Sequence, residues 1–141
     1  MVAHGYAQTY RSNAVLTASP GQLVLMLYDG VLKSLAIARD AFGWSVDDPR
    51  RIEAINQQLL KAQKIITELQ SGLNHDAGGE VAQTLERLYD YYNRRLFEAN
   101  LRKQVEPVVE VERLVRDLRN AWAEMLCKQG VPAAESVRSV A

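Results

Sequence analysis

The sequence predicts an all-α protein, an antiparallel up-down-up-down four-helix bundle with an N-terminal arm. Apolar residues recur at spacings of three and four along four segments of similar length, and no segment alternates as a half-buried strand would. Glycine or proline separates the segments, and short connections favour antiparallel neighbours. A chain of 141 residues can bury the core of one domain. We expect an arm or lid over residues 1–18, the bundle over 19–130 and a loose tail over 131–141.

The first helix is predicted over residues 20–42 and begins with a capping box. Ser19 is a good N-cap, Pro20 suits the first helical position, and Gln22 can reach back to the cap. Apolar residues then occupy nearly every side of this helix, so we expect it to be the most buried of the four. Charged residues interrupt the apolar run before it reaches the roughly 20 residues of a membrane span. No membrane insertion is therefore expected.

The second helix is predicted to begin with Asp48 as N-cap and Pro49 in the first position. Its apolar residues follow at alternating spacings of three and four, which indicates a heptad seam. The seam consists of Ile52, Ile55, Leu59, Ala62, Ile66, Leu69 and Leu73. Leu60 and Ile65 lie off this seam.

The third and fourth helices are predicted over residues 80–104 and 107–129, after a glycine-rich break at 74–79. The inward stripe of the third comprises Val81, Leu85, Leu88, Tyr92, Leu96 and Ala99. That of the fourth comprises Val111, Leu114, Leu118, Ala121 and Met125, with Val108, Val115 and Trp122 alongside. Cys127, near the end of the fourth helix, is interpreted as a buried small hydrophobe.

Composition and motifs argue against an enzyme, a cofactor or a nucleic-acid partner. The 17 basic residues balance 17 acidic ones, so no net charge attracts nucleic acid. A di-metal bundle needs Glu-x-x-His pairs, which the sequence lacks, and its histidines, His4 and His75, fall in the arm and in a loop. Cys127 has no nearby histidine to act as a base. These observations disfavour a bundle enzyme or a metal carrier.

Residues 89–96 form the most prominent polar cluster, which is rich in tyrosine and arginine. One interpretation is a solvated face with i,i+4 pairs such as Asp90 with Arg94. The other is a contact surface, because tyrosine and arginine are enriched at interface hot spots. The residues alone leave both interpretations open.

Several stretches, spread in order from the arm to the fourth helix, resemble one protein family. They are Tyr6 and Tyr10 ahead of Asn13-Ala14-Val15, Thr17-Ala18-Ser19-Pro20, Met26-Leu27-Tyr28-Asp29-Gly30, Ala62-Gln63-Lys64-Ile65-Ile66, Gly78-Gly79-Glu80-Val81-Ala82, Leu88-Tyr89-Asp90-Tyr91, Arg94-Arg95-Leu96, Glu98-Ala99-Asn100, and Leu118-Arg119 with Ala121-Trp122. This ordered set resembles the FliS family, the flagellar export chaperones of flagellin. The chain departs from the family at Tyr92-Asn93 and in Trp44-Ser45-Val46, which extends the first loop.

The resemblance implies a helical bundle in the bacterial cytosol that binds the C-terminal segment of flagellin. Such a chaperone prevents premature polymerisation of flagellin and assists its delivery to the flagellar type III export apparatus, so the export gate is expected as a second partner. A disordered client segment can lay its apolar faces into grooves between helices, which suits this role. A helical-bundle adaptor with a different client remains the alternative.

We expect the client to dock over outer apolar positions of the second and third helices, with Arg95 and Asn100 in the polar rim. The expected flagellin-binding groove comprises Ile55, Leu59, Leu60, Ile65, Ile66, Tyr91, Arg95, Leu96 and Asn100. The sizeable apolar groups of the arm are Tyr6, Tyr10, Val15 and Leu16. The resemblance suggests that these residues form a lid over an apolar groove, while the residues alone also allow a disordered arm.

Overall fold

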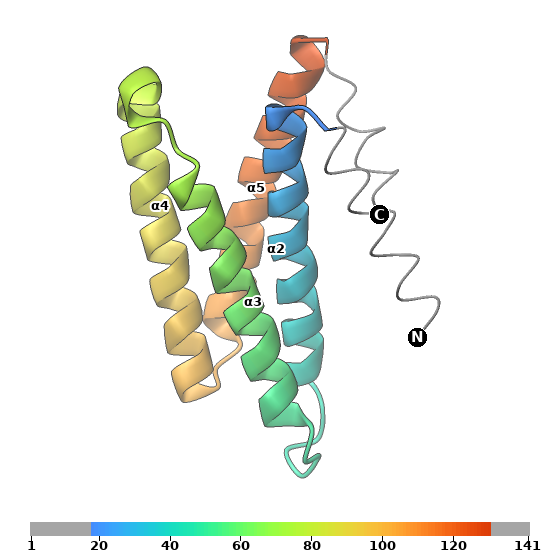
Figure 1. The fold of residues 1–141 in the computed structure, drawn as a ribbon. Helices are drawn as coiled ribbons and strands as arrows, with labels where there is room; N and C mark the ends of the chain where they lie inside the picture. Colours follow the sequence, from blue (N-terminus) through green and yellow to red (C-terminus); the bar gives the residue numbers. More distant parts are fainter. Residues whose placement is uncertain (1–17, 131–141) are drawn as a thin grey trace. The chain divides into compact units, whose positions relative to one another are not determined.

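A computed structural model describes residues 18–130, which form four helices (Figure 1). The helices are α2 (Pro20–Phe42), α3 (Arg51–Ser71), α4 (His75–Arg102) and α5 (Glu106–Lys128). The part of the chain that the structure describes contains no strand. It divides into two compact units, a larger one of Leu27–Asp117 and a smaller one that includes residues 18–26 and 118–130.

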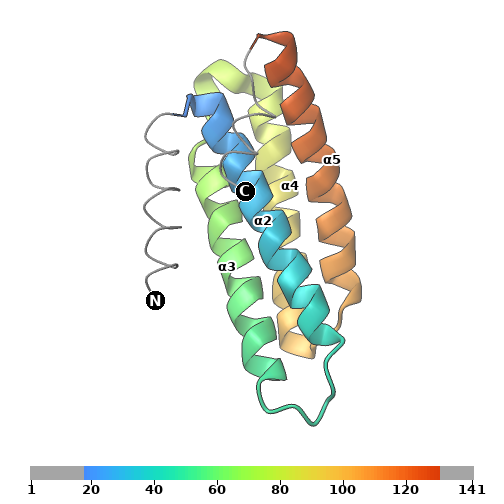
Figure 2. The same ribbon diagram turned by 90° about the vertical axis from the view of Figure 1, so that its right-hand side faces the viewer.

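The larger unit contains parts of all four helices, and successive helices run in opposite directions (Figures 1 and 2). Helices α3 and α4 pack side by side along their length. The predicted all-α, antiparallel four-helix arrangement is therefore confirmed. The predicted arm and the tail after residue 130 lie outside the described residues, apart from Ala18.

Helix α2 begins with the predicted capping box. The Gln22 amide donates to the Ser19 hydroxyl oxygen at 3.2 Å, and the Ser19 amide donates to Gln22 Oε1 at 2.9 Å. Of the described helices α2 has the most buried residues, as predicted; they are Leu25, Tyr28, Val31, Ser34, Leu35, Ala38 and Ala41. By length and composition α2 could cross a membrane. A helix that buries one face in the core of a bundle can have the same length and composition, so this observation alone does not indicate a membrane span.

Helix α3 begins at Arg51, two residues later than predicted. The Asp48 carboxylate accepts the backbone N–H of Arg50 at 2.9 Å, so this aspartate caps a turn that precedes the helix. Five of the seven predicted seam residues are buried, namely Ile55, Leu59, Ala62, Ile66 and Leu69. Ile52, in the first turn, is 53% exposed, so the seam reaches the core only from Ile55 onward.

Helix α4 begins at His75, so the predicted break at 74–79 is wrong in part. Asn74 Oδ1 accepts the amide of Ala77 at 3.1 Å and caps a first helical turn. The break is confined to Gly79, whose φ of 52° and ψ of −126° suit glycine. Beyond this kink Ala82 is buried and Val81 is 68% exposed, which moves the start of the inward stripe by one residue.

The end of α5 differs most from the prediction. Ala121, Met125 and Cys127 are exposed, whereas Leu126 is buried, so the expected burial of the first three residues was wrong. The reason lies in the smaller unit, where Leu126 packs against Leu25 at the start of α2. This contact and a hydrogen bond from Trp122 to α2 orient the last turns of α5, and the exposed positions beside Leu126 face outward.

Gly21 allows the close approach of these two helix ends in the smaller unit. A Cβ atom added at Gly21 would lie 2.5 Å from Leu126 Cδ2. Trp122 Nε1 donates to the Gly21 carbonyl at 2.8 Å, which satisfies the indole. The pattern of α5 alone does not reveal this contact, because it depends on a glycine far away in the sequence.

Two tyrosines place a polar contact inside the larger unit. The hydroxyl oxygens of Tyr28 on α2 and Tyr89 on α4 lie 2.6 Å apart, and both residues are 2% exposed. Tyr92 lies edge-on to Tyr89 with its ring centroid at 6.3 Å. Burial raises the pKa of Tyr28 and Tyr89, and it raises the pKa of Tyr92 to about 12. The phenols therefore stay protonated and can share the hydrogen bond.

We expect Tyr28→Phe and Tyr89→Phe each to lower the free energy of unfolding by about 1–2 kcal/mol, because each leaves a buried hydroxyl without its partner. The double variant should lose less than the sum of the two, since no unpaired hydroxyl remains. Urea unfolding of the wild type and the three variants measures this. Strictly additive losses would contradict a direct hydrogen bond as their cause.

Candidate functional site

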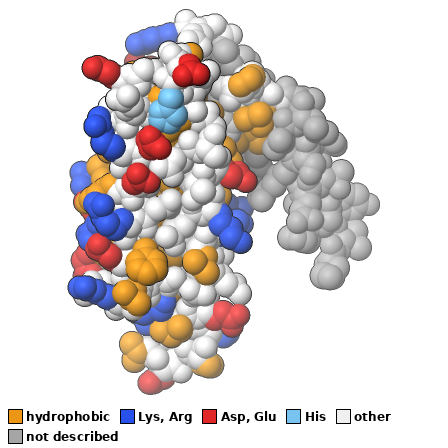
Figure 3. All heavy atoms as spheres, turned by 60° about the vertical axis from the view of Figure 1, so that its left-hand side comes forward, with side chains coloured by type: hydrophobic (Ala, Val, Ile, Leu, Met, Phe, Trp, Pro, Cys, Tyr) orange, Lys and Arg blue, Asp and Glu red, His pale blue; other side chains and the backbone are white. Residues whose placement is uncertain are grey.

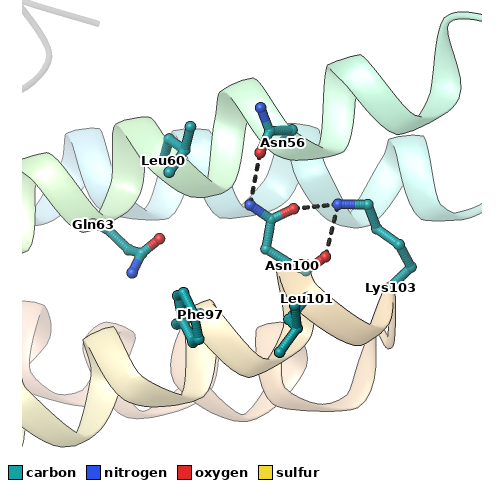
Figure 4. A pocket seen from close by; sticks show the side chains of 7 residues that line it. All are labelled: Asn56, Leu60, Gln63, Phe97, Asn100, Leu101 and Lys103. Carbon is teal, nitrogen blue, oxygen red and sulfur yellow. Dashed lines mark hydrogen bonds between the residues drawn. The ribbon is translucent and has the colours of Figure 1, made fainter.

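A hollow lies on the outer side of the α3–α4 pair in the larger unit (Figure 4). It is lined by Asn56, Leu60 and Gln63 from α3, by Phe97, Asn100 and Leu101 from α4, and by Lys103. The close-up places Gln63 at one end of the hollow and Lys103 at the other. We call these seven residues the α3–α4 hollow.

The apolar part of the α3–α4 hollow consists of large side chains that remain in solvent. Leu60 is 46% exposed, Phe97 57% and Leu101 70%. Phe97 and Leu101 are four residues apart and share one face of α4. Ile52 lies eight residues before Leu60 on the same face of α3 and is also exposed. Figure 3 shows hydrophobic side chains gathered on the lower half of this face, among charged ones.

The polar part of the α3–α4 hollow is a chain of amides that ends at a cation. Asn100 Nδ2 donates to Asn56 Oδ1 at 2.8 Å, which joins the two helices. Lys103 Nζ donates to the Asn100 carbonyl at 2.7 Å and also to Asn100 Oδ1. Gln63 Nε2 donates to the Asn93 carbonyl at 3.2 Å. Burial and the charge of Arg51 lower the pKa of Lys103.

The structure places the predicted groove residues in different environments, some in the core and others at the surface. Ile55, Leu59, Ile66 and Leu96 are at most 1% exposed and belong to the core. Ile65 is half-buried and its Cδ1 lies 3.3 Å from the position of a Cβ on Gly30 of α2. Only Leu60 and Asn100 of the predicted set line the α3–α4 hollow. The buried residues support the hollow from beneath and cannot touch a partner while α3 and α4 stay packed.

Tyr91 and Arg95, which were also predicted for the groove, connect α4 to α5. The Tyr91 hydroxyl donates to Glu110 Oε2 at 2.7 Å, and Arg95 Nε donates to Glu110 Oε1 at 2.7 Å. Arg95 also pairs with Glu98 at 2.9 Å. The hydrogen bonds from Arg95 and Tyr91 lower the pKa of the Glu110 carboxyl. These side chains are thus engaged within the bundle.

The i,i+4 pair of Asp90 and Arg94, which one of the two interpretations of this cluster contained, is not formed. Asp90 instead accepts a hydrogen bond from Gln70 Nε2 at 2.7 Å, across to α3. Arg94 lies over the Tyr91 ring, 5.3 Å from its centroid. The tyrosine and arginine cluster therefore splits between contacts to both neighbouring helices.

Five residues that line the α3–α4 hollow were not in the predicted groove set, namely Asn56, Gln63, Phe97, Leu101 and Lys103, although Leu101 was recognised as an outer apolar position of its helix. The i,i+4 pair of Phe97 and Leu101 was a visible signal, because both residues lie off the inward stripe of α4. No comparable pattern in the sequence indicated that Lys103 would line the hollow. Its backbone is left-handed, with φ and ψ both 52°, and ends α4 with an N–H bond to the Ala99 carbonyl.

The chemistry of this surface is that of a protein-binding site. Exposed apolar side chains beside amides and a charged rim are typical of interfaces. Within residues 18–130 no group of three or more His, Cys, Asp or Glu side chains could hold a metal ion. Fold and surface together define a helical bundle with exposed apolar side chains in a hollow between two of its helices.

Comparison with known proteins assigns this bundle to a family. The family model described as "Flagellar protein FliS" matches residues 2–129. The chain is 41% identical over 117 residues to the flagellar secretion chaperone FliS of Bacillus subtilis, which covers 83% of each chain. It is 40% identical over 121 residues to that of Salmonella typhimurium, covering 85% of this chain and 86% of the relative. The chain belongs to the FliS family of flagellar secretion chaperones, and it is a chaperone rather than an enzyme.

We expect Arg95→Met to lower the free energy of unfolding at pH 7, because Glu110 loses its cation. The folded-state pKa of Glu110 lies below its ordinary value of 4.5. This contribution is therefore present above pH 4.5 and is lost as the pH falls through the folded-state pKa.

Urea unfolding at pH 7 and at about pH 3 measures this effect. Arg94→Met is the matched control, because Arg94 forms no ion pair with a carboxylate among residues 18–130 and lies over the Tyr91 ring instead. The deficit of Arg95→Met should shrink at the lower pH. An equal deficit at both values would exclude the ion pair as its source.

Proposed function

We propose that this chain binds the C-terminal segment of flagellin in the bacterial cytosol, prevents its premature polymerisation and assists its delivery to the flagellar type III export apparatus. The FliS family membership and the names of the relatives support this proposal. The structural observation that carries it is the α3–α4 hollow, where Leu60, Phe97 and Leu101 remain exposed beside side-chain amides.

The hollow suits a client segment that is disordered when free and helical when bound. An amphipathic helix can lay side chains at i, i+3 and i+4 over an apolar groove. Leu60 of α3 and Phe97 and Leu101 of α4 line the same hollow and remain exposed, which supplies a two-helix groove. A client whose apolar face is covered in this way cannot use that face to polymerise.

Delivery to the export apparatus adds a second proposed partner, the flagellar export gate. This part of the proposal rests on the family alone. A chaperone that holds its client by one face of α3 and α4 leaves its remaining surfaces open to the export machinery. Nucleic acid is not a proposed partner, because the 17 basic and 17 acidic residues balance.

We expect Leu60→Asp and Phe97→Asp each to weaken flagellin binding by about 2–4 kcal/mol, because a carboxylate in the apolar contact must be desolvated. Val81→Asp is the matched control, since Val81 is also an exposed apolar residue of α4 but lies outside the hollow. Titration calorimetry with full-length flagellin measures the losses. Wild-type affinity in both hollow variants would place the client elsewhere.

The same titration with C-terminally truncated flagellin tests the identity of the client segment. The proposal requires binding to be lost with the truncation. Equal binding of full-length and truncated flagellin would favour an adaptor with a different client or client segment. Leu96→Asp is unsuitable here, because Leu96 is fully buried and the variant would report on folding.

The arm is proposed to act as a lid that competes with the client. Its apolar residues Tyr6, Tyr10, Val15 and Leu16 lie outside the described residues, so this proposal rests on sequence and family. Deletion of residues 1–12 should tighten flagellin binding, because the client no longer has to displace the arm. Titration calorimetry compares the truncated and full chains. Unchanged or weaker binding would contradict competition by the arm.

A further inference from the structure

One end of the α3–α4 hollow carries an ammonium group with unused hydrogen-bonding capacity. Lys103 Nζ donates to the carbonyl and to the side-chain oxygen of Asn100. An ammonium has three donors, so one remains for another acceptor. Figure 4 shows this group at the end of the hollow opposite Gln63, next to Asn100 and Leu101.

No carboxylate of the described chain neutralises this ammonium. No ion pair joins Lys103 to an acidic side chain among residues 18–130. The cation Arg51, at the start of α3, is directed at the end of α2, where Nη2 donates to the Phe42 carbonyl at 3.1 Å and the guanidinium lies over the Phe42 ring. Lys103 therefore lines the hollow as a cation without a counter-charge, and a negatively charged ligand group supplies the charge that it lacks.

The backbone at Lys103 also sets this position apart. Lys103 is the one residue other than glycine with positive φ among residues 18–130. Glycine adopts this conformation at a helix end with less strain. The bonds from Nζ to Asn100 give Lys103 a structural role at this position, because a cation near a helix C-terminus satisfies free carbonyls. They do not use the third donor, which is available to a ligand in the hollow.

We propose that Lys103 binds the C-terminal α-carboxylate of the client, so that the client chain ends at this end of the α3–α4 hollow. The inference rests on the proposed function and adds the direction of the client and a specificity for its chain terminus. Lys103 lies beyond Leu60 and Phe97 at this end of the hollow, so the last turn of a helical client that covers these residues brings its carboxylate to the ammonium.

A chain terminus matches this end of the hollow in two ways. A helix presents its free carbonyls and the negative end of its dipole at its C-terminus, so the dipole and the carboxylate both face the Lys103 ammonium. The carboxylate can accept the remaining donor of this ammonium, and charge-assisted bonds of this kind are strong. An acidic side chain within a client lacks the dipole contribution, because the free carbonyls occur only at the end of its helix.

The test compares two synthetic peptides of the cognate flagellin's C-terminal segment, one with a free terminal carboxylate and one amidated. Titration calorimetry uses the full chain as wild type, Lys103→Met and Arg102→Met. Arg102 is the matched control, since it is an adjacent exposed cation outside the hollow. We expect amidation to weaken binding to the wild type about tenfold, the factor for one charge-assisted contact.

Lys103→Met should weaken binding of the free-acid peptide by a similar factor, and amidation should then cost nothing further, because the two changes remove one contact. Arg102→Met should retain the full preference for the free acid. Raising the salt concentration should reduce that preference in the wild type.

Equal affinity of the wild type for both peptides would overturn this inference and leave the proposed function standing. Equal weakening of both peptides by Lys103→Met would also overturn it, because the lysine would then act on an internal acid or on the fold. Failure of the wild type to bind either peptide would overturn the proposed function as well. The peptide comparison uses unaltered protein, so it does not depend on the folding of any variant.

Discussion

The packing of α3 against α4 determines which side chains of the larger unit a partner can reach. Ile55, Leu59 and Ile66 are buried along one face of α3, and Leu96 is fully buried on α4. Because side chains three and four apart share a helix face, this seam directs Leu60 outward. The outer hollow is therefore a consequence of how the core closes.

Polar contacts hold this arrangement at the places where hydrophobic packing alone is not specific. Asn56 and Asn100 bond across α3 and α4 inside the hollow itself. The buried hydroxyls of Tyr28 and Tyr89 join α2 to α4, and Glu110 receives both of its donors from α4. Buried polar groups favour one packing over its neighbours, because a shifted register leaves them unpaired. A rigid groove of this kind lowers the entropy cost of ordering a disordered client.

Much of the fold could be predicted because it depends on local spacing. The capping box at Ser19 and the seam of α3 are both determined by residues three or four apart, and the structure contains them. The end of α5 could not be predicted in this way. The exposure of Cys127 and the burial of Leu126 depend on the close approach to Gly21, about a hundred residues earlier.

The sequence predicted the residues of the hollow less completely than it predicted the helices. Periodicity indicates which residues share a helix face, but it does not show how deeply each of these residues is buried. Ile55 and Leu96 were therefore assigned to a groove although both are core, while Leu60 was assigned to the surface correctly. Lys103 was missed because a left-handed helix end has no signature in the spacing of apolar residues.

The proposed docking on the outside of a closed α3–α4 pair requires that the client does not separate the two helices. Spin labels on Glu68→Cys of α3 and Arg87→Cys of α4, with Cys127→Ser to remove the exposed native thiol, report the distance between these helices. Both labelled positions are exposed and lie outside the hollow. Pulsed electron paramagnetic resonance should find the same distance with and without bound flagellin. An increase on the order of 8–10 Å, the spacing of packed helices, would mean that the client inserts between α3 and α4 and would contradict the account.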